Sequence, residues 1–388
     1  MTQGKPPALC VLSNRSKFQV NFAKRHATVD PERGEPLATP TRGSRGPAKD
    51  KKNNRQGVDH MKKILLGLLA AAALAVPAVA QDKPAVLYDL GGKFDKSFNE
   101  AAYNGAEKFK AESGIAYVEF EVSNASQREQ ALRRFAEDGR DPIVMVGFAW
   151  SDALARIADE FPETKFAIID MVVEKPNVRS IVFKEEEGSY LAGIMAAMAS
   201  TSKKVGFVGG MDIPLIRKFG CGYVGGAKAA GATDVIQNMT GDTPAAWNDP
   251  TKGGEIAKSQ IGQGADVIYA AAGGTGVGVL QAAADAGKLG VGVDSNQNGL
   301  IPGKILTSMI KRVDVAVYDA FQTAKDGAFQ PGVNVLGLKE DGVGVAIDDN
   351  NKPLVTAEMT AAVDKAKADI IAGTVKVHDY TTDSTCPY

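Results

Sequence analysis

The chain has 388 residues, of which 44% are hydrophobic and 7% aromatic, and its formal net charge is −1. This composition is typical of a globular protein with room for two full cores, and it excludes fibrous, collagen-like and wholly disordered proteins. The charge is split along the chain: residues 1–60 hold 12 Lys and Arg against 5 Asp and Glu, whereas residues 81–388 hold 31 against 41. An acidic body has no general attraction for phosphate backbones, so we expect no nucleic-acid binding.

Residues 1–60 show no hydrophobic periodicity and carry Pro, Gly and Arg in clusters. We expect this stretch to be a spurious or disordered extension, with Met61 as the true start of the protein. The alternative is a basic tail that binds an acidic partner.

Residues 61–80 have the pattern of a cleavable signal peptide. Two lysines precede an apolar run over residues 64–76, and small residues lead up to Ala80. A membrane anchor is the alternative, but an apolar run of 13 residues is short for a membrane span. A lipoprotein would need Cys at the cleavage point, where Gln81 stands, so we expect a protein that is free in the periplasm.

Short apolar runs alternate with amphipathic segments after Gln81. Residues 85–90 predict a buried strand, and residues 97–113 predict a helix with Ser97 as its N-cap and Gly114 as its stop. The alternation forms two blocks, and later elements are shared between them. Strands that alternate with helices imply parallel sheets covered on both faces, so we predict two doubly wound α/β lobes. Such sheets bind ligands at the carboxyl ends of their strands, and two facing lobes would place those ends around one cleft.

Polar residues or glycines follow nearly every predicted strand. This joint placement indicates a binding cleft, although each residue alone is a weak signal because such loops are usually polar. The residues at these ends are Asp89 with Phe98 and Asn99, Gly147 and Phe148, Asp170, Gly209 to Met211, Gly273 to Gly276, and Asp294 to Gln297.

Cysteine, histidine and glycine patterns exclude several kinds of site. His378 is the sole histidine after Gln81, so neither a Cys/His zinc site nor a Ser-His-Asp triad can be assembled, and we expect no metal or cofactor. The glycines at 273–278 fit no frame of the dinucleotide fingerprint. Cys221 and Cys386 predict one disulfide in an oxidising compartment, with two buried thiols as the alternative.

The order of these motifs resembles the basic membrane protein (BMP) family. The resemblance covers residues 84–380 and includes DLGGKFDKSFNEAAYNGA, FKEEEGSYLAG, WNDPTKG, AAAGGTGVG, GVDSNQ and LTSMIKRVDVAV. It implies the substrate-binding protein of an ABC importer, a type I periplasmic binding protein whose two lobes close about a hinge. By this resemblance lobe one comprises residues 81–184 and 311–340, and lobe two comprises residues 185–310 and 341–388.

The resemblance also implies a ligand and partners. Members of the family mostly bind purine nucleosides, here guanosine, inosine or adenosine, and deliver them to an ABC permease with ATPase subunits in the inner membrane. Many members are lipoproteins, which this chain is not expected to be. A monomeric receptor without enzymatic activity is implied.

The candidate ligand-binding residues divide by chemistry. Phe98 and Trp247 would stack on the two faces of a base, and Asp294 and Lys311 resemble the ribose-binding pair of the family. Asp170 would accept ring N–H groups and so favour guanine or hypoxanthine over adenine. Core packing is the alternative for the aromatic residues, and a solvated loop position is the alternative for the charged ones. The remaining candidates are Asp89, Asn99, Phe148, Phe219, Gly273 and Gly274.

Three rival functions remain at this level. A pentose or free purine could fill the same cleft, although a flat aromatic sandwich suits a base better than a sugar. A secreted nucleoside hydrolase could use paired carboxylates from Asp89, Asp95, Asp170 and Asp294. A ligand-sensing regulator would require a DNA-binding module, which the N-terminal extension does not resemble.

Overall fold

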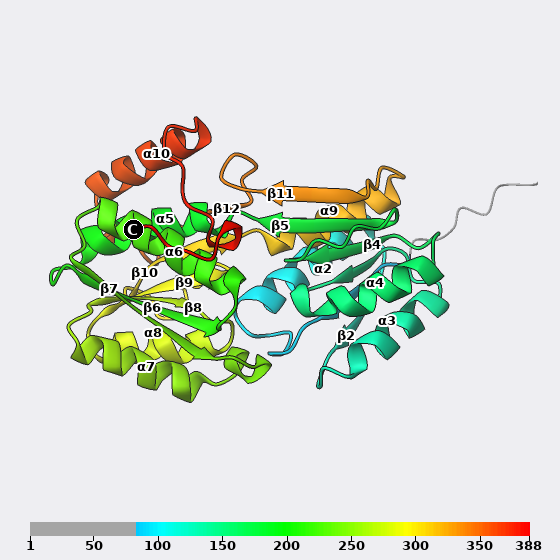
Figure 1. Ribbon diagram of the computed structural model, residues 1–388, viewed down its shortest axis with the longest axis horizontal. Helices are drawn as coiled ribbons and strands as arrows, with labels where there is room; N and C mark the ends of the chain where they lie inside the picture. The colour runs from blue at the N-terminus through cyan, green and yellow to red at the C-terminus, as the bar shows by residue number, and fades with distance from the viewer. Residues whose placement is uncertain (1–82) are drawn as a thin grey trace, which may run out of the picture. The chain divides into compact units, whose positions relative to one another are not determined.

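The computed structural model describes residues 83–388, which form two α/β lobes (Figure 1). The predicted extension and signal peptide lie outside the described residues. Within residues 83–388, no helix is both long enough and apolar enough to cross a membrane.

The first lobe is built on a sheet of six parallel strands in the order β11-β5-β4-β3-β1-β2. Helices α2 (Phe98–Ser113) and α9 (Val313–Lys325) pack together on this lobe, as do α3 (Gln127–Glu137) and α4 (Ser151–Glu160). The strands are β1 (Ala85–Tyr88), β2 (Val118–Glu121), β3 (Ile143–Met145), β4 (Phe166–Ile169), β5 (Val178–Phe183) and β11 (Gly332–Leu336).

The second lobe repeats this arrangement in the order β12-β10-β9-β8-β6-β7, with only β12 antiparallel to its neighbour. Helix α5 (Glu185–Ala199) packs on α6 (Pro214–Ala229), and α7 (Pro250–Gly262) packs on α8 (Thr275–Asp285). The strands are β6 (Lys204–Met211), β7 (Asp234–Gly241), β8 (Val267–Ala271), β9 (Leu289–Asp294), β10 (Ile305–Lys311) and β12 (Val343–Val345).

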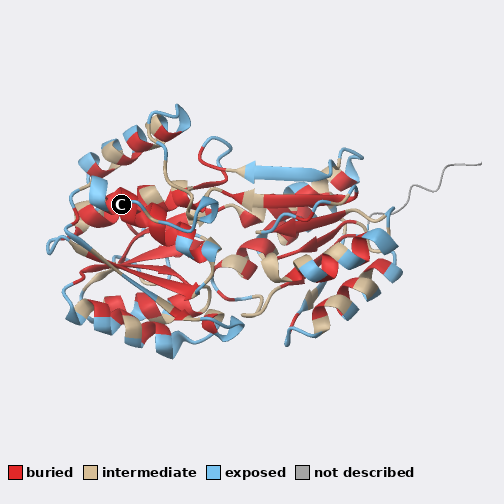
Figure 2. Ribbon diagram, viewed as in Figure 1, coloured by how far each residue is buried: buried red, intermediate tan, exposed pale blue. Residues whose placement is uncertain are grey.

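Each sheet has an apolar core on both faces, which explains why its central strands are apolar at consecutive positions. In β1, Val86 and Tyr88 join the core on the α2 and α9 side, whereas Ala85 and Leu87 join the core on the α3 and α4 side. Figure 2 shows these central strands as buried and β11 as exposed. The predicted class, two doubly wound α/β lobes, is confirmed.

The chain passes between the sheets three times. It leaves the first sheet after β5 to form α5, returns after β10 to form α9, and leaves again between β11 and β12. Lys311, which the sequence analysis placed in the returning segment of lobe one, is the last residue of β10 in the second sheet.

The start of α2 differs from the expectation in one respect. The helix spans Phe98–Ser113 and ends at Gly114, whose φ of 74° matches the predicted stop. The Ser97 hydroxyl does not cap the helix. The carboxylate of Asp95 accepts from the backbone N–H groups of Ser97, Asn99 and Glu100 instead, at 2.8–3.1 Å. A longer carboxylate arm satisfies three donors at once, which leaves the serine hydroxyl free for another partner.

The C-terminal part of the chain lies against the second lobe. Helix α10 (Ala357–Ile371) packs on α5, and the following C-terminal segment, residues 374–388, contains the short 3-10 helix η5 (Tyr380–Thr382) beside α6. Cys221 of α6 and Cys386 are joined by a disulfide, with their Cα atoms 5.6 Å apart. The bond ties the end of the chain to this lobe across 165 residues of sequence.

Candidate functional site

A cavity lined by residues of both lobes lies between the carboxyl ends of the strands of the two sheets. Ten of the eleven predicted ligand-binding residues line it, namely Asp89, Phe98, Asn99, Phe148, Asp170, Phe219, Trp247, Gly273, Asp294 and Lys311. Gly274, at the N-cap position of α8, is not among the lining residues, and a Cβ built on it would lie 3.3 Å from the carbonyl oxygen of Trp247.

Two aspartates face the cavity from equivalent strands. Asp170 follows β4 and Asp294 ends β9, and each of these strands is the third from the β11 or β12 edge of its sheet. Both residues adopt left-handed backbone conformations, with φ of 70° and 62°. Aspartate tolerates this conformation better than most residues, and the turn directs the carboxylate away from the strand.

Burial raises the pKa of Asp170 and that of Asp294 to about 6, although Lys311 opposes the shift in both cases. Lys311 Nζ lies 2.7 Å from Oδ2 of Asp170. The hydroxyl of Ser97 donates to Oδ2 of Asp294 at 2.5 Å. Among the described residues, no donor reaches Oδ1 of Asp170. That buried oxygen is therefore an acceptor that a ligand can satisfy.

Lys311 is the cation of the cavity, and its side chain is only 2% exposed. Besides Asp170, Nζ pairs with Oε1 of Glu185 at 3.0 Å. The rings of Phe98, Phe183 and Phe219 have centroids 5.0–5.5 Å from Nζ. Burial alone would lower the pKa of Lys311, but the carboxylates around it outweigh burial and raise that pKa. The ammonium group is thus held charged in an aromatic setting.

Asp89 differs from Asp170 and Asp294 because its donors come from its own lobe. Arg128 Nη2 lies 2.5 Å from its Oδ1, and the N–H of Leu90 donates to the same oxygen at 2.8 Å. Asn99 holds the loop in place, since its amide accepts from the N–H of Asp89 and donates to the carbonyls of Asp89 and Gly92. Asn99 therefore supports the loop as well as lining the cavity.

Trp247 of the second lobe packs over two glycines of the same lobe, Gly210 and Gly273. It ends the 3-10 helix η3 (Pro244–Trp247), and a Cβ built on Gly210 would lie 2.1 Å from the indole ring. Gly273, at φ 55°, lies beneath the same residue. Any side chain at Gly210 would displace the indole, so this glycine near the end of β6 is what allows Trp247 to reach the cavity.

The charge of the cavity is negative. Four of its lining residues are aspartates, Asp95 among them, and Lys311 is the single basic residue in the lining. Burial raises the pKa of Asp95 to about 6 against the effect of its three backbone donors. Within residues 83–388, no group of three His, Cys, Asp or Glu side chains is arranged to hold a metal ion.

Several residues of the site were not predicted. Leu215 and Ile216 of α6 line the cavity, whereas Arg128 and Glu185 hold its charged groups from outside. Leu215 and Ile216 precede the predicted Phe219 by one helical turn, and this spacing was a signal for them. The pairing of Arg128 with Asp89 spans 39 residues and left no local signal.

Comparisons with known proteins agree on the family. Residues 83–380 match the family of ABC transporter substrate-binding proteins described as PnrA-like. The ABC transporter nucleoside-binding protein BmpA of Lactococcus lactis is 35% identical over 318 residues, which cover 76% of this chain and 88% of that protein. An uncharacterised lipoprotein of Pyrococcus abyssi is 36% identical over 298 residues, which cover 72% and 73% of the two chains.

A solved structure shares both fold and sequence. The ABC transporter solute-binding protein of Aeropyrum pernix K1 superposes with a TM-score of 0.72 at 31% identity, covering 77% of this chain and 93% of that one. The corresponding protein of Conexibacter woesei, at 24% identity and a TM-score of 0.63, shares the fold. Some relatives are named lipoproteins, whereas Gln81 follows the predicted cleavage site here. The chain belongs to the Bmp family of ABC transporter substrate-binding proteins.

Proposed function

We propose that this protein binds a purine nucleoside in the cavity between its lobes and delivers it to an ABC permease. One observation carries the proposal: matching aspartates end equivalent strands of the two sheets and face a single cavity flanked by aromatic rings from both lobes. The name of the Lactococcus lactis relative, a nucleoside-binding protein, supports the same ligand class.

The aromatic residues suit a flat base. Phe98 comes from lobe one and Trp247 from lobe two, so a ring between them would contact both lobes at once. Stacking of a base on an aromatic side chain contributes roughly 1–3 kcal/mol. Phe98 also packs against the main apolar core, so its two predicted roles are compatible.

The polar groups suit a ribose and the edge of a purine. Asp294 would accept from the vicinal ribose hydroxyls, and Lys311 has a third N–H to donate once Asp170 and Glu185 are satisfied. The unpartnered Oδ1 of Asp170 would accept from a ring N–H. Guanine and hypoxanthine carry such a donor on the six-membered ring and adenine does not, so guanosine and inosine should bind more tightly than adenosine.

The charge of the cavity separates nucleosides from nucleotides. A phosphate would bring negative charge among four aspartates and a single lysine. Like charges in a buried site repel strongly because water does not screen them. A neutral nucleoside avoids this repulsion while its hydroxyl and N–H groups still satisfy the carboxylates.

Capture would proceed by closure of the two lobes. Ser97 of lobe one already bonds to lobe two through Asp294 and through its carbonyl, which accepts from the hydroxyl of Ser295 at 2.8 Å. Gln297 Nε2 donates across the same boundary to the carbonyl of Lys96 at 2.8 Å. A ligand that adds further bridges between the lobes shifts the population toward this closed arrangement. In this scheme a monomeric periplasmic receptor docks, closed, on its permease and ATPase subunits.

Calorimetric titration of purified protein, freed of ligand by unfolding and refolding, tests the proposal. We expect guanosine and inosine to bind and adenosine to bind more weakly, with no heat from guanine, ribose or guanosine monophosphate. Binding confined to ribose would overturn the nucleoside assignment and leave a sugar receptor. Release of free base during prolonged incubation with guanosine would instead identify a hydrolase.

A further inference from the structure

A second buried lysine lies outside the cavity and is not used by the proposed function. Lys218 of α6 is 7% exposed, and its Nζ donates to the carbonyl of Phe183 at 2.8 Å. The same ammonium group lies 3.1 Å from Oε2 of Glu185 and 3.3 Å from Oε2 of Glu186. A buried lysine is costly unless it is paired, so its presence at this position calls for an explanation.

Glu185 connects this lysine to the ligand site. Its side chain is 1% exposed, and its two oxygens divide between two lysines, with Oε1 on Lys311 and Oε2 on Lys218. Burial raises the pKa of the Glu185 carboxyl, but the two ammonium groups outweigh burial and hold that pKa below its ordinary value. Lys311 in turn pairs with Asp170 in the cavity. Asp170, Lys311, Glu185 and Lys218 therefore form one continuous chain of alternating charge.

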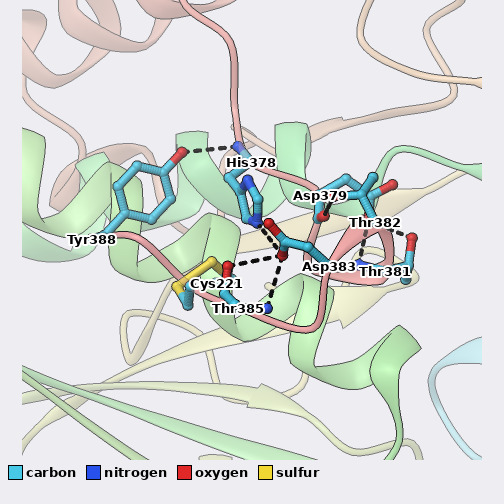
Figure 3. The surroundings of a disulfide bond; sticks show 9 residues. Cys221, His378, Asp379, Thr381, Thr382, Asp383, Thr385 and Tyr388 are labelled. Atoms are coloured by element: carbon cyan, nitrogen blue, oxygen red, sulfur yellow. Dashed lines mark hydrogen bonds and ion pairs between the residues drawn. A yellow bond between two sulfur atoms is a disulfide. The ribbon is translucent and has the colours of Figure 1, made fainter.

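The C-terminal segment lies beside α6, and Figure 3 shows its residues around the disulfide at Cys221. Asp379 places Oδ2 3.6 Å from Nζ of Lys218. The segment is fixed by the disulfide at Cys221, one helical turn beyond Lys218, and by the hydroxyl of Tyr388, which accepts from the N–H of His378 at 2.9 Å. Gly225 of α6 lies directly beneath the Tyr388 ring. The segment thus brings a third carboxylate, that of Asp379, close to Lys218.

We propose that Lys218 is a positioning residue of the ligand site, which fixes Glu185 against Lys311 and so sets the affinity of the cavity for its ligand. Without the Lys218 charge, Glu185, Asp170 and Asp294 would share the single ammonium of Lys311. That excess of negative charge would be relieved by protonation of Glu185 as the pH falls, and Lys311 would then lose a partner. This loss changes the groups that a ligand meets.

The consequence depends on pH. Lys218 is faced by Glu185 and Glu186 of α5 and by Asp379 of the C-terminal segment, and Lys311 is faced by Asp170, Glu185 and Asp294. Burial raises the pKa of Glu186 to about 7, and Lys218 limits that shift. Removing the Lys218 charge raises the pKa of Glu185 and that of Glu186, both of which Lys218 lowers in the wild type. Glu185, which pairs with Lys311, then protonates at a higher pH, so affinity is lost from a higher pH downward.

Three substitutions separate this role from simple packing. Lys218→Gln keeps a donor for the Phe183 carbonyl and removes the charge, Lys218→Arg keeps the charge, and Lys228→Gln makes the same neutralising change at an exposed position of the same helix. With guanosine titrated between pH 5.5 and 8.5, we expect Lys218→Gln to weaken binding about tenfold at pH 6 and little at pH 8.5, because Glu185 loses an ammonium group that keeps it ionised. Lys218→Arg and Lys228→Gln should follow the wild type. A loss of affinity equal at every pH would overturn the proposal.

This inference rests on the proposed function only for the identity of the ligand. A measurement on ligand-free protein therefore tests it separately. The buried ammonium groups of Lys218 and Lys311 can be followed by nitrogen-15 NMR and assigned with Lys218→Arg and Lys311→Arg. In ligand-free protein, Asp170→Asn should shift the Lys218 signal, because Lys311 and Glu185 alone join the two residues. The Lys228 signal should stay in place. An unmoved Lys218 signal would overturn the charge chain even if guanosine binds, and a moved one would support it even if no nucleoside binds.

Discussion

The two lobes share one strand order, yet they contribute differently to the cavity. Asp170 of lobe one and Asp294 of lobe two end equivalent strands with the same left-handed backbone, and burial raises the pKa of both to about 6. Asp170 is held by a lysine from the opposite lobe, whereas Asp294 is held by Ser97 from the opposite lobe. Each lobe thus supplies a carboxylate that the other lobe orients. This reciprocity explains why the site is complete only when the lobes meet.

The lobes differ more in what supports them. Lobe one ends in the parallel strand β11, which is largely exposed, whereas lobe two ends in antiparallel β12 and carries both α10 and the disulfide-bound C-terminal segment. Helix α6 of lobe two also supplies Leu215, Ile216 and Phe219 to the cavity wall. The lobe with the additional support therefore contributes three apolar side chains of one helix to the cavity wall, whereas α2 of lobe one contributes Phe98 and Asn99 from its first turn.

Loss of the disulfide should give the largest effect on stability, and this effect should differ between the two lobes. Cys386→Ser removes a link across 165 residues, which we expect to lower the free energy of unfolding by about 2–5 kcal/mol. Denaturant unfolding measures this change, and hydrogen exchange locates it. Exchange should rise in α6 and α10 of lobe two and stay unchanged in α3 and α4 of lobe one. An equal rise in both lobes would show that the segment supports the whole protein.

The fold could be predicted from the sequence because its signals are local. The apolar run at 85–90 and the amphipathic residues after Ser97 identify β1 and α2 without any partner. The role of Ser97 itself could not be predicted, because a serine before a helix normally caps it, and Asp294, the acceptor of its hydroxyl, lies 197 residues away. Pattern analysis detects the helix boundary and misses the contact between lobes.

Neutralising the paired aspartates tests their equivalence in binding. Asp294→Asn and Asp170→Asn keep the shape and tolerate the left-handed backbone, so both proteins should fold. Each variant removes a charged acceptor, and we expect nucleoside affinity to fall by about 1.5–3 kcal/mol, or roughly ten- to hundredfold. Calorimetric titration measures both variants. Asp89→Asn should cost less, because Arg128 already occupies one oxygen of Asp89. A larger loss at Asp89 would transfer the main polar role to the loop that follows β1.

The aromatic residues were predictable to different degrees. Trp247 could be assigned to the site from sequence because no apolar periodicity surrounds it, and the structure places it in the cavity lining. The glycine that makes this possible, Gly210, lies 37 residues earlier at the end of β6. Only the folded structure shows that a Cβ at this position would clash with the indole. The charge chain through Glu185 and Lys218 left no sequence signal, because it depends on helices α5 and α6 packing side by side.

Removing one aromatic ring at a time compares how much Trp247 and Phe98 each contribute to stacking on the base. Trp247→Ala should reduce nucleoside affinity by about 1–3 kcal/mol through lost stacking, and Phe98→Leu should reduce it less because leucine preserves the contact with the core. The ratio of affinities for guanosine and ribose in each variant is the decisive quantity. It should fall in both. If it fell only in the Trp247 variant, the base would stack on lobe two alone.

The smallest expected effects are two opposite pH dependences, one of the stability of the ligand-free protein and one of its affinity for nucleoside. A carboxyl whose folded pKa is raised to about 6 stabilises the ligand-free protein at low pH, and this contribution is lost as the pH rises through 6. The ligand needs the ionised carboxylate, so affinity should instead fall about tenfold per aspartate between pH 7 and pH 5, as follows from a single titration at pH 6. Comparing wild type with Asp170→Asn and Asp294→Asn isolates these terms from the other carboxyls of the chain. Each substitution should flatten both slopes by a similar amount, because the two aspartates share their burial and their lysine. Flattening by only one of them would show that a single lobe controls the proton that nucleoside binding displaces.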